Sequence, residues 1–303
     1  MSALLSYLLS QNIVCAMGVM LMMCAWQSYL NILPLWMRKE VDIHGNCSLQ
    51  ELRLRTGLPP ELIFSNSSKC LKRVVTYEDI QFVINCASQY SPWTAATMAE
   101  GFITAAGGHR IGICGHAVVE NGIMRGIREP TSLCIRVARD FNGIANNKLL
   151  LTGSVLILGP PGSGKTTFLR DLVRQRSATE SGSISVIDER GELFPVCTYN
   201  ADFFPGKRTD ILRFCRKPQG IITVLKTMGP CCIAVDEITC EEDCAALQQA
   251  ALCGVTVIGT VHASDIADLS KRRFFNKLLE NKTFQRIVIM KRDKTWFLEE
   301  VPQ

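Results

Sequence analysis

The stretch Gly159-Pro160-Pro161-Gly162-Ser163-Gly164-Lys165-Thr166 decides the fold of this chain. It matches the pattern G-x-x-x-x-G-K-[ST] of a phosphate-binding loop. The apolar run Val155–Leu158 precedes it, and a helical stretch from Thr167 to Gln175 follows it. Because a strand before the loop and a helix after it are the context that the motif requires, the stretch predicts a nucleotide site.

Each residue type in the loop has a physical task. Glycines let backbone N–H groups approach a phosphate without a Cβ in the way, and the helix that follows presents its positive end to the same anion. Lys165 is expected to reach the β- and γ-phosphate oxygens, and the Thr166 hydroxyl is expected to bind Mg²⁺. We therefore predict that Gly159 to Thr167 bind ATP.

Outward from the loop, short apolar runs alternate with longer amphipathic stretches. A parallel sheet covered by helices on both faces, an α/β fold, has this pattern. The expected strands are Val155–Leu158, Ile184–Ile187, Cys232–Val235, Thr256–Gly259 and Ile287–Met290.

The run Cys232–Val235 ends on two acids, Asp236 and Glu237. A buried strand does not end on paired carboxylates without partners, because burying unpaired charge costs several kcal/mol. Asp236 is therefore predicted to serve Mg²⁺, and Glu237 to orient and deprotonate water. An acid in the position of Glu237 favours hydrolysis over transfer to a small acceptor.

Other polar residues are expected at the same edge of the sheet, where open α/β sheets bind ligands. Asp188-Glu189-Arg190 ends one strand, and Thr260 and His262 end another. His262 is a candidate sensor of the γ-phosphate. Three arginines are candidates for neutralising charge within or between subunits, and the sequence does not choose among Arg190, Arg208 and Arg213.

The first half of the chain predicts a smaller α+β domain. A helix is expected from Thr76 to Gln89, with Thr76 as its N-cap. Short strands and glycine turns follow, at Phe102–Thr104, Arg110–Cys114, Ala117–Val119 and Leu133–Val137. The predicted domains are residues 29–147 and 148–303, with a linker near Asn146-Asn147.

Residues 1–28 form an apolar leader, and the first charged side chain is Arg38. The run Ile13–Trp26 is shorter than the roughly 20 residues that span a bilayer. Three interpretations stay open: a start placed upstream of the real one, a membrane-associated segment, or a buried helix.

Composition sets broader bounds. The chain has 303 residues, of which 47% are hydrophobic and 20% charged, with a formal net charge of +5. These values exclude a disordered or collagen-like chain and give no reason to expect nucleic acid. The 14 cysteines include no Cys-x-x-Cys pair and are interpreted as reduced thiols rather than disulfides or a zinc site.

Together these residues resemble the stage III sporulation protein AA family. The resemblance runs from about Tyr29 to the C-terminus. It is carried by the phosphate loop, Asp188-Glu189-Arg190 and Asp236-Glu237-Ile238, and by more specific segments: Glu51–Arg55, Gly101–Thr104, Gly107–Gly112, Ala117–Gly122, Ser132–Ala138 and Arg208–Asp210. Thr239-Cys240 departs from the Gly-Arg of the family pattern, and residues 1–28 lie outside it.

The resemblance implies a RecA-like ATPase core with a smaller N-terminal domain, similar to the hexameric motors of secretion and pilus systems. It implies a cytoplasmic, mother-cell protein at the membrane that drives a channel complex between mother cell and forespore. Lys165 and Thr166 then contact nucleotide and Mg²⁺, Asp236 is the metal-side acid and Glu237 the catalytic base. A nucleotide-dependent switch and a nucleic-acid motor remain the alternatives, and no nucleic acid is expected as a partner.

Overall fold

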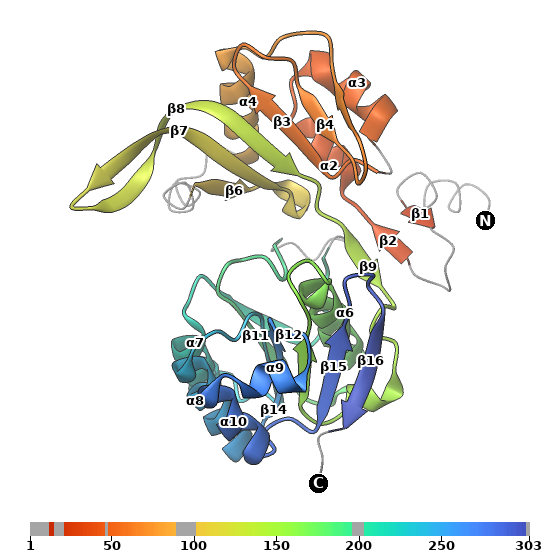
Figure 1. Ribbon diagram of the computed structural model, residues 1–303, viewed down its shortest axis with the longest axis vertical. Coiled ribbons are helices and arrows are strands. Elements are labelled where there is room, and N and C mark those ends of the chain that lie inside the picture. The colour runs from red at the N-terminus through yellow and green to blue at the C-terminus, as the bar shows by residue number, and fades with distance from the viewer. Residues whose placement is uncertain (1–11, 15–20, 46–47, 89–100, 196–202, 301–303) are drawn as a thin grey trace. The chain divides into compact units, whose positions relative to one another are not determined.

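The computed structural model of the chain describes residues 12–14, 21–45, 48–88, 101–195 and 203–300. Within these ranges the chain divides into two compact units, the first ending at Asp140 and the second beginning at Phe141 (Figure 1). None of the described helices combines the length and apolar character that a membrane-spanning segment needs.

Most of the apolar leader lies outside the described residues. Its described part contains two three-residue strands, β1 (Asn12–Val14) and β2 (Leu21–Met23), which pair antiparallel. Helix α2 (Trp26–Asn31) begins immediately afterwards.

The first unit is a six-stranded antiparallel sheet with helices. The strand order is β5-β4-β3-β8-β7-β6. The strands are β3 (Glu51–Arg55), β4 (Glu61–Ile63), β5 (Ser68–Cys70), β6 (Phe102–Thr104), β7 (Arg110–Glu120) and β8 (Ile123–Arg136). The short strand β9 (Asp140–Asn142) is not part of this sheet and spans the boundary between the two units. The helices are α2, α3 (Leu35–Gly45), α4 (Tyr77–Ser88) and the single turn η1 (Ala106–Gly108).

Local sequence explains these elements. In β3 the leucines alternate with charged residues, so Leu52 and Leu54 are buried in the core while their neighbours face outward. Helix α4 begins directly after Thr76, the predicted N-cap, and a capping box forms there. Asp79 N–H donates to the Thr76 hydroxyl at 3.3 Å, and Thr76 N–H donates to the Asp79 carboxylate at 3.0 Å.

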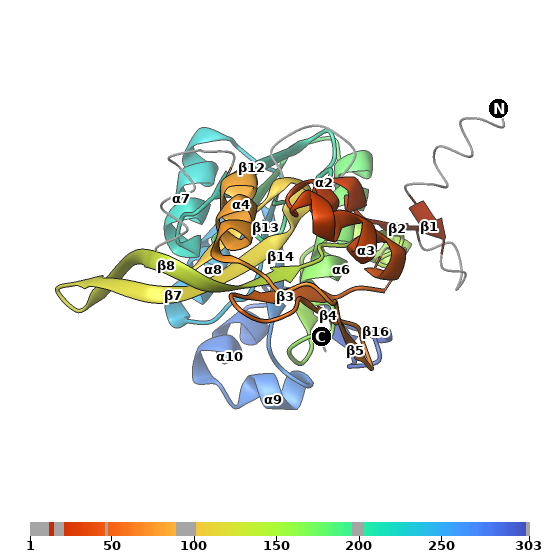
Figure 2. The ribbon, with the colours of Figure 1, turned by 90° about the horizontal axis from the view of Figure 1, so that it is seen from above.

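Strands β7 and β8 form a long two-stranded ribbon that extends beyond the rest of the sheet (Figure 2). The prediction of separate strands at Arg110–Cys114 and Ala117–Val119 is wrong, because β7 passes through both. Between them the register shifts at Gly115, where a Cβ would lie 2.7 Å from the Glu129 carbonyl oxygen. A glycine there lets the ribbon bulge and continue.

The second unit is a seven-stranded sheet of order β12-β11-β13-β14-β10-β15-β16, parallel except for β16. Its strands are β10 (Val155–Leu158), β11 (Ile184–Asp188), β12 (Thr209–Arg213), β13 (Cys232–Val235), β14 (Thr256–Val261), β15 (Arg286–Met290) and β16 (Trp296–Glu300). All five predicted strands are confirmed. The edge strands β12 and β16 were not predicted, because neither contains an apolar run of four or more residues.

Helices cover both faces of this sheet, as expected for an α/β fold. Helix α6 (Lys165–Thr179) packs in one apolar cluster with alternate strand residues. The helices of the other face are α7 (Lys217–Thr227), α8 (Glu241–Leu252), α9 (Ile266–Ser270) and α10 (Arg273–Glu280). The turn η2 (Lys148–Leu151) precedes β10.

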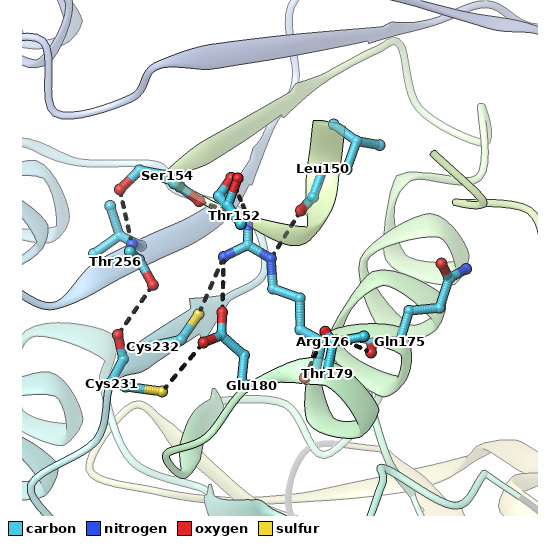
Figure 3. Close-up of polar contacts among 12 residues, drawn as sticks. Leu150, Thr152, Ser154, Gln175, Arg176, Thr179, Glu180, Cys231, Cys232 and Thr256 are labelled. Carbon is cyan, nitrogen blue, oxygen red and sulfur yellow. Dashed lines mark hydrogen bonds and ion pairs between the residues drawn. The ribbon is translucent and has the colours of Figure 1, made fainter. Parts of the chain in front are cut away.

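A fully buried arginine fixes the far end of α6 (Figure 3). Arg176 Nε donates to the Leu150 carbonyl at 2.9 Å, and its NH2 group donates to the Gly153 carbonyl at 2.6 Å and the Thr152 carbonyl at 3.3 Å. These bonds satisfy a charge that would be costly to bury alone. These bonds tie the last turn of α6 to the segment before β10, so they join the two elements that flank the phosphate loop at their far ends.

Candidate active site

The topology brings three predicted motifs to one edge of the second sheet. The phosphate loop follows β10, Asp236 and Glu237 follow β13, and His262 follows β14, which lies between β10 and β13. The carboxyl ends of parallel strands share an edge, so all three motifs converge there. In the loop, Gly162 and Gly164 have φ of 73° and 98°, which side chains with a Cβ rarely adopt.

Lys165 is buried under the loop. Its Nζ donates to the Gly159 carbonyl at 2.8 Å and the Pro160 carbonyl at 3.0 Å, and lies 2.8 Å from His262 Nδ1. Burial lowers the pKa of Lys165, and the nearby Asp236 and Glu237 carboxylates oppose that shift. The Lys165 ammonium group therefore donates to loop carbonyl oxygens, and a bound phosphate would replace these oxygens as the acceptor.

The contact with Lys165 assigns the His262 tautomer. An ammonium group can only donate, so Nδ1 of His262 accepts and Nε2 carries the proton. Nε2 lies 3.2 Å from Glu237 Oε1 and donates to it. His262 thus links the phosphate-binding lysine to the predicted catalytic base.

A second chain of hydrogen bonds runs through Asp236. The Thr166 hydroxyl donates to Oδ2 at 2.8 Å, and the Thr260 hydroxyl donates to Oδ1 at 2.5 Å. Thr260 Oγ1 in turn accepts the Glu237 N–H at 2.8 Å. The adjacent oxygens of Thr166 and Asp236 are hard ligands of the kind that Mg²⁺ prefers, so these two residues fit a magnesium ion.

Glu237 has an unusual backbone and a tightly held side chain. Its φ is 51°, in the left-handed region that non-glycine residues rarely occupy. Arg190 NH1 lies 2.7 Å from Oε2, and His262 Nε2 contacts Oε1. The next residue, Ile238, donates its N–H to the Thr260 carbonyl at 2.8 Å. The strained backbone thus holds a carboxylate between two cationic or N–H donors.

The residues of Asp188-Glu189-Arg190 have separate partners. Asp188 is buried and accepts the N–H groups of Glu192, Leu193 and Phe194, which makes it a support of the loop after β11. Burial raises the pKa of Asp188, and the amides of Phe194 and Leu193 oppose the shift. Arg190 alone reaches the Glu237 carboxylate.

The other two candidate arginines lie at opposite ends of strand β12. Arg213, at the end of β12, pairs in register with Asp188 and donates to the Phe194 carbonyl. Arg208 precedes β12 and accepts an N–H from Ile184 at the start of β11. Arg208 therefore does not share the site with Lys165 and Glu237 within one chain.

Sequence reasoning missed a buried lysine beside the site. Lys217, in the first turn of α7, lies 2.5 Å from the Glu189 carboxylate and 3.8 Å from Asp243, which also accepts the Thr239 N–H. This cluster ties the loop after β13 to the loop after β11. A lysine at a helix start looks like a surface residue, so the sequence carries no signal for it.

Comparison with known proteins agrees with this geometry. A family model described as "Sporulation stage III, protein AA" matches residues 26–296. The "Stage III sporulation protein AA" of Bacillus subtilis (strain 168) is 36% identical over 256 residues, covering 81% of this chain and 83% of that protein.

Two solved structures share the fold. The pilus retraction motor PilT with bound ADP aligns with a TM-score of 0.60 at 18% identity, covering 84% of this chain and 76% of that chain. The Legionella pneumophila ATPase DotB aligns with a TM-score of 0.57 at 17% identity, covering 88% and 79%. The chain therefore shares its fold with these two proteins, in agreement with the predicted RecA-like α/β core.

Proposed function

Because this chain belongs to the sporulation stage III protein AA family, we propose that it is a Mg²⁺-dependent ATPase that works as a ring-shaped motor. The observation that carries the proposal is the chain of contacts from Thr166 through Asp236 and Thr260 to Glu237. It joins a fitting metal position to a carboxylate that could activate water, which a protein that only binds nucleotide would not need.

Each residue has a role in this proposal. Lys165 and the amides of the phosphate loop bind the β- and γ-phosphates, as the glycine conformations and the buried ammonium group favour. Thr166 and Asp236 would hold Mg²⁺, which supplies neutralisation of the developing phosphate charge.

The water-activating group is Glu237. Its carboxylate is oriented by Arg190 on Oε2 and by His262 on Oε1. Because each carboxylate oxygen has a second lone pair, Glu237 can accept a proton from water while it stays oriented. His262 also contacts Lys165 and is placed to respond when a γ-phosphate displaces that contact.

Assembly and location are part of the proposal. We expect a homo-oligomer, most simply a hexamer, in which an arginine such as Arg208 or Arg213 completes the site of a neighbour. The pilus motor and DotB alignments support this choice through fold alone. The cellular context proposed is the cytoplasmic face of the mother-cell membrane, with channel proteins of the sporulation complex as partners.

The test is phosphate release from the purified chain over a concentration series, beside Lys165→Ala and Glu237→Gln. A ring motor gives specific activity that rises with concentration, nucleotide binding without turnover in Glu237→Gln, and neither in Lys165→Ala. Equal turnover in all three proteins contradicts the proposal. Binding without turnover in the unchanged chain, with and without membrane extract, indicates the nucleotide switch instead.

A further inference from the structure

A lysine at the start of α7 lies between two carboxylates. Lys217 Nζ is 2.5 Å from Glu189 Oε2 and 3.8 Å from Asp243 Oδ2. Lys217 and Asp243 are buried, whereas Glu189 is partly exposed. Because one buried ammonium group faces carboxylates from two different segments, it holds the loop after β11 and the first turn of α8 together.

The Asp243 carboxylate in turn fixes the backbone that follows Glu237. Its Oδ2 accepts the Thr239 N–H at 3.0 Å and the Thr239 hydroxyl at 3.3 Å. The two preceding amides are bonded as well, since Glu237 N–H donates to the Thr260 hydroxyl and Ile238 N–H to the Thr260 carbonyl, both at 2.8 Å. Three consecutive N–H groups are thus held at the point where the backbone takes its rare φ of 51°.

The Glu189 carboxylate leads to the side chain of Glu237. The residue after Glu189 is Arg190, whose NH1 lies 2.7 Å from Glu237 Oε2. A cavity of 20 Å³, enough for one water molecule, has Lys217, Asp236 and Glu237 among its lining residues. Lys217 therefore lies next to the candidate base and is connected to both its backbone and its carboxylate.

We propose that Lys217 is a positioning residue for Glu237, which acts by holding Asp243 and Glu189 in place. The proposal rests on the ATPase function proposed above. A misplacement of about 1 Å at a catalytic group can lower a rate about 100-fold, so loss of the lysine should slow the chemical step. Nucleotide binding should change little, because the phosphate loop follows a different strand, β10.

The test measures kcat and KM separately for hydrolysis of ATP with Mg²⁺. Lys217→Met keeps most of the side-chain length without the charge, and should lower kcat about 30-fold with KM within about twofold. The matched control is Lys226→Met, an exposed lysine in the last turn of the same helix, which should leave both constants unchanged. Urea unfolding of each protein verifies that it is folded under the assay conditions.

Two substitutions at Asp243 separate charge from position. Asp243→Asn keeps an oxygen that can accept the Thr239 N–H, whereas Asp243→Ala removes it. We expect kcat to fall about fivefold for the first and about 30-fold for the second. If two unpaired carboxylates prevent Lys217→Met from folding, the double variant Lys217→Met/Glu189→Gln removes one of them and should show the same loss of kcat.

A further measurement distinguishes positioning from a purely structural role. In the Glu237→Gln background no base remains to be positioned, so Lys217→Met should lower the residual single-turnover rate less than about twofold. Equal losses with and without Glu237 would overturn the proposal.

The remaining outcomes separate this inference from the proposed function. If the unchanged chain hydrolyses ATP and Lys217→Met has the same kcat, or differs only in KM, the positioning role is wrong and the ATPase function stands. If the unchanged chain hydrolyses no ATP at any concentration, the proposed function fails and the positioning role fails with it.

Discussion

Two histidines, one in each unit, show how differently the same side chain is used. His109 in the first unit is fully buried, and backbone groups hold both of its nitrogens: Ala138 N–H donates to Nδ1 at 3.1 Å, and Nε2 donates to the Ala25 carbonyl at 3.0 Å. His262 in the second unit is partly exposed and lies between Lys165 and Glu237. The first is fastened to backbone, and the second joins two ionisable side chains.

The difference shows that a segment can be typical of a family without taking part in the family's chemistry. Gly107-Gly108-His109-Arg110 is the more family-specific segment, yet its histidine connects α2 to the segment after β8. A Cβ at Gly107 would lie 2.4 Å from the Ala25 side chain and 2.9 Å from His109 Nε2. The contact between His109 and Ala25 therefore requires glycine at this position. The generic phosphate loop, by contrast, carries the chemistry.

The largest effect that would test this comparison is on stability. His109→Ala should lower the free energy of unfolding by about 4 kcal/mol, because it leaves a cavity and two buried backbone groups without partners. Urea unfolding followed by tryptophan fluorescence measures this, since Trp26 stacks on Tyr29 beside the histidine. His116→Ala, on the exposed ribbon, is the control and should change stability by less than about 0.5 kcal/mol. A similar change in the free energy of unfolding for both variants would contradict the structural role of His109.

The corresponding change in the second unit should affect turnover instead. His262→Ala is expected to lower kcat about 100-fold, because Glu237 loses a donor that orients it. KM and unfolding free energy should stay nearly constant, since the side chain is partly exposed. His262→Gln, which keeps a donor and an acceptor, should recover part of the rate. A loss of stability with unchanged kcat would make the two histidines alike.

The next largest effect is a loss of stability on acidification, which we expect to arise at His109. Burial lowers the pKa of His109 to about 4 from 6.5, so the folded state favours the neutral ring. The contribution of His109 to the free energy of unfolding is therefore fully present above pH 6.5. It decreases below pH 6.5, where the imidazole takes up a proton in the unfolded chain but not in the folded one. Between pH 6.5 and about 5 the loss should be about 2 kcal/mol. Urea unfolding over this range measures the slope, and His109→Gln should reduce it. An unchanged slope in that variant would assign the acid sensitivity to other groups.

Sequence patterns predicted the second unit well because its signals are local. Runs such as Val155–Leu158 and Cys232–Val235 are strands with the expected ends, and parallel pairing then forces their last residues to one edge. The α/β fold and the meeting of Lys165, Asp236 and His262 follow from that rule.

The features that the sequence did not predict depend on partners far away along the chain. Lys217 gains its role from residues far along the chain, and the apolar runs of the edge strands β12 and β16 are shorter than four residues. The one long strand β7 was divided in the prediction, because Gly115 resembles a turn unless its partner Glu129 is known. The role of His109 was also hidden, since its partners are backbone atoms.

The smallest expected effect on turnover is that of Arg190, which pairs with the Glu237 carboxylate. Arg190 has a side chain that is 61% exposed, so its ion pair with Glu237 is screened by water and should contribute less than about 1 kcal/mol to stability. Arg190→Gln should lower kcat only about threefold, since His262 still orients the carboxylate. Phosphate release at low and high salt measures this, with Arg190→Lys as the variant that keeps the charge. A loss of about 100-fold or more would mean that Arg190 acts on the nucleotide itself, and the orientation of Glu237 by His262 would then explain only part of the catalytic site.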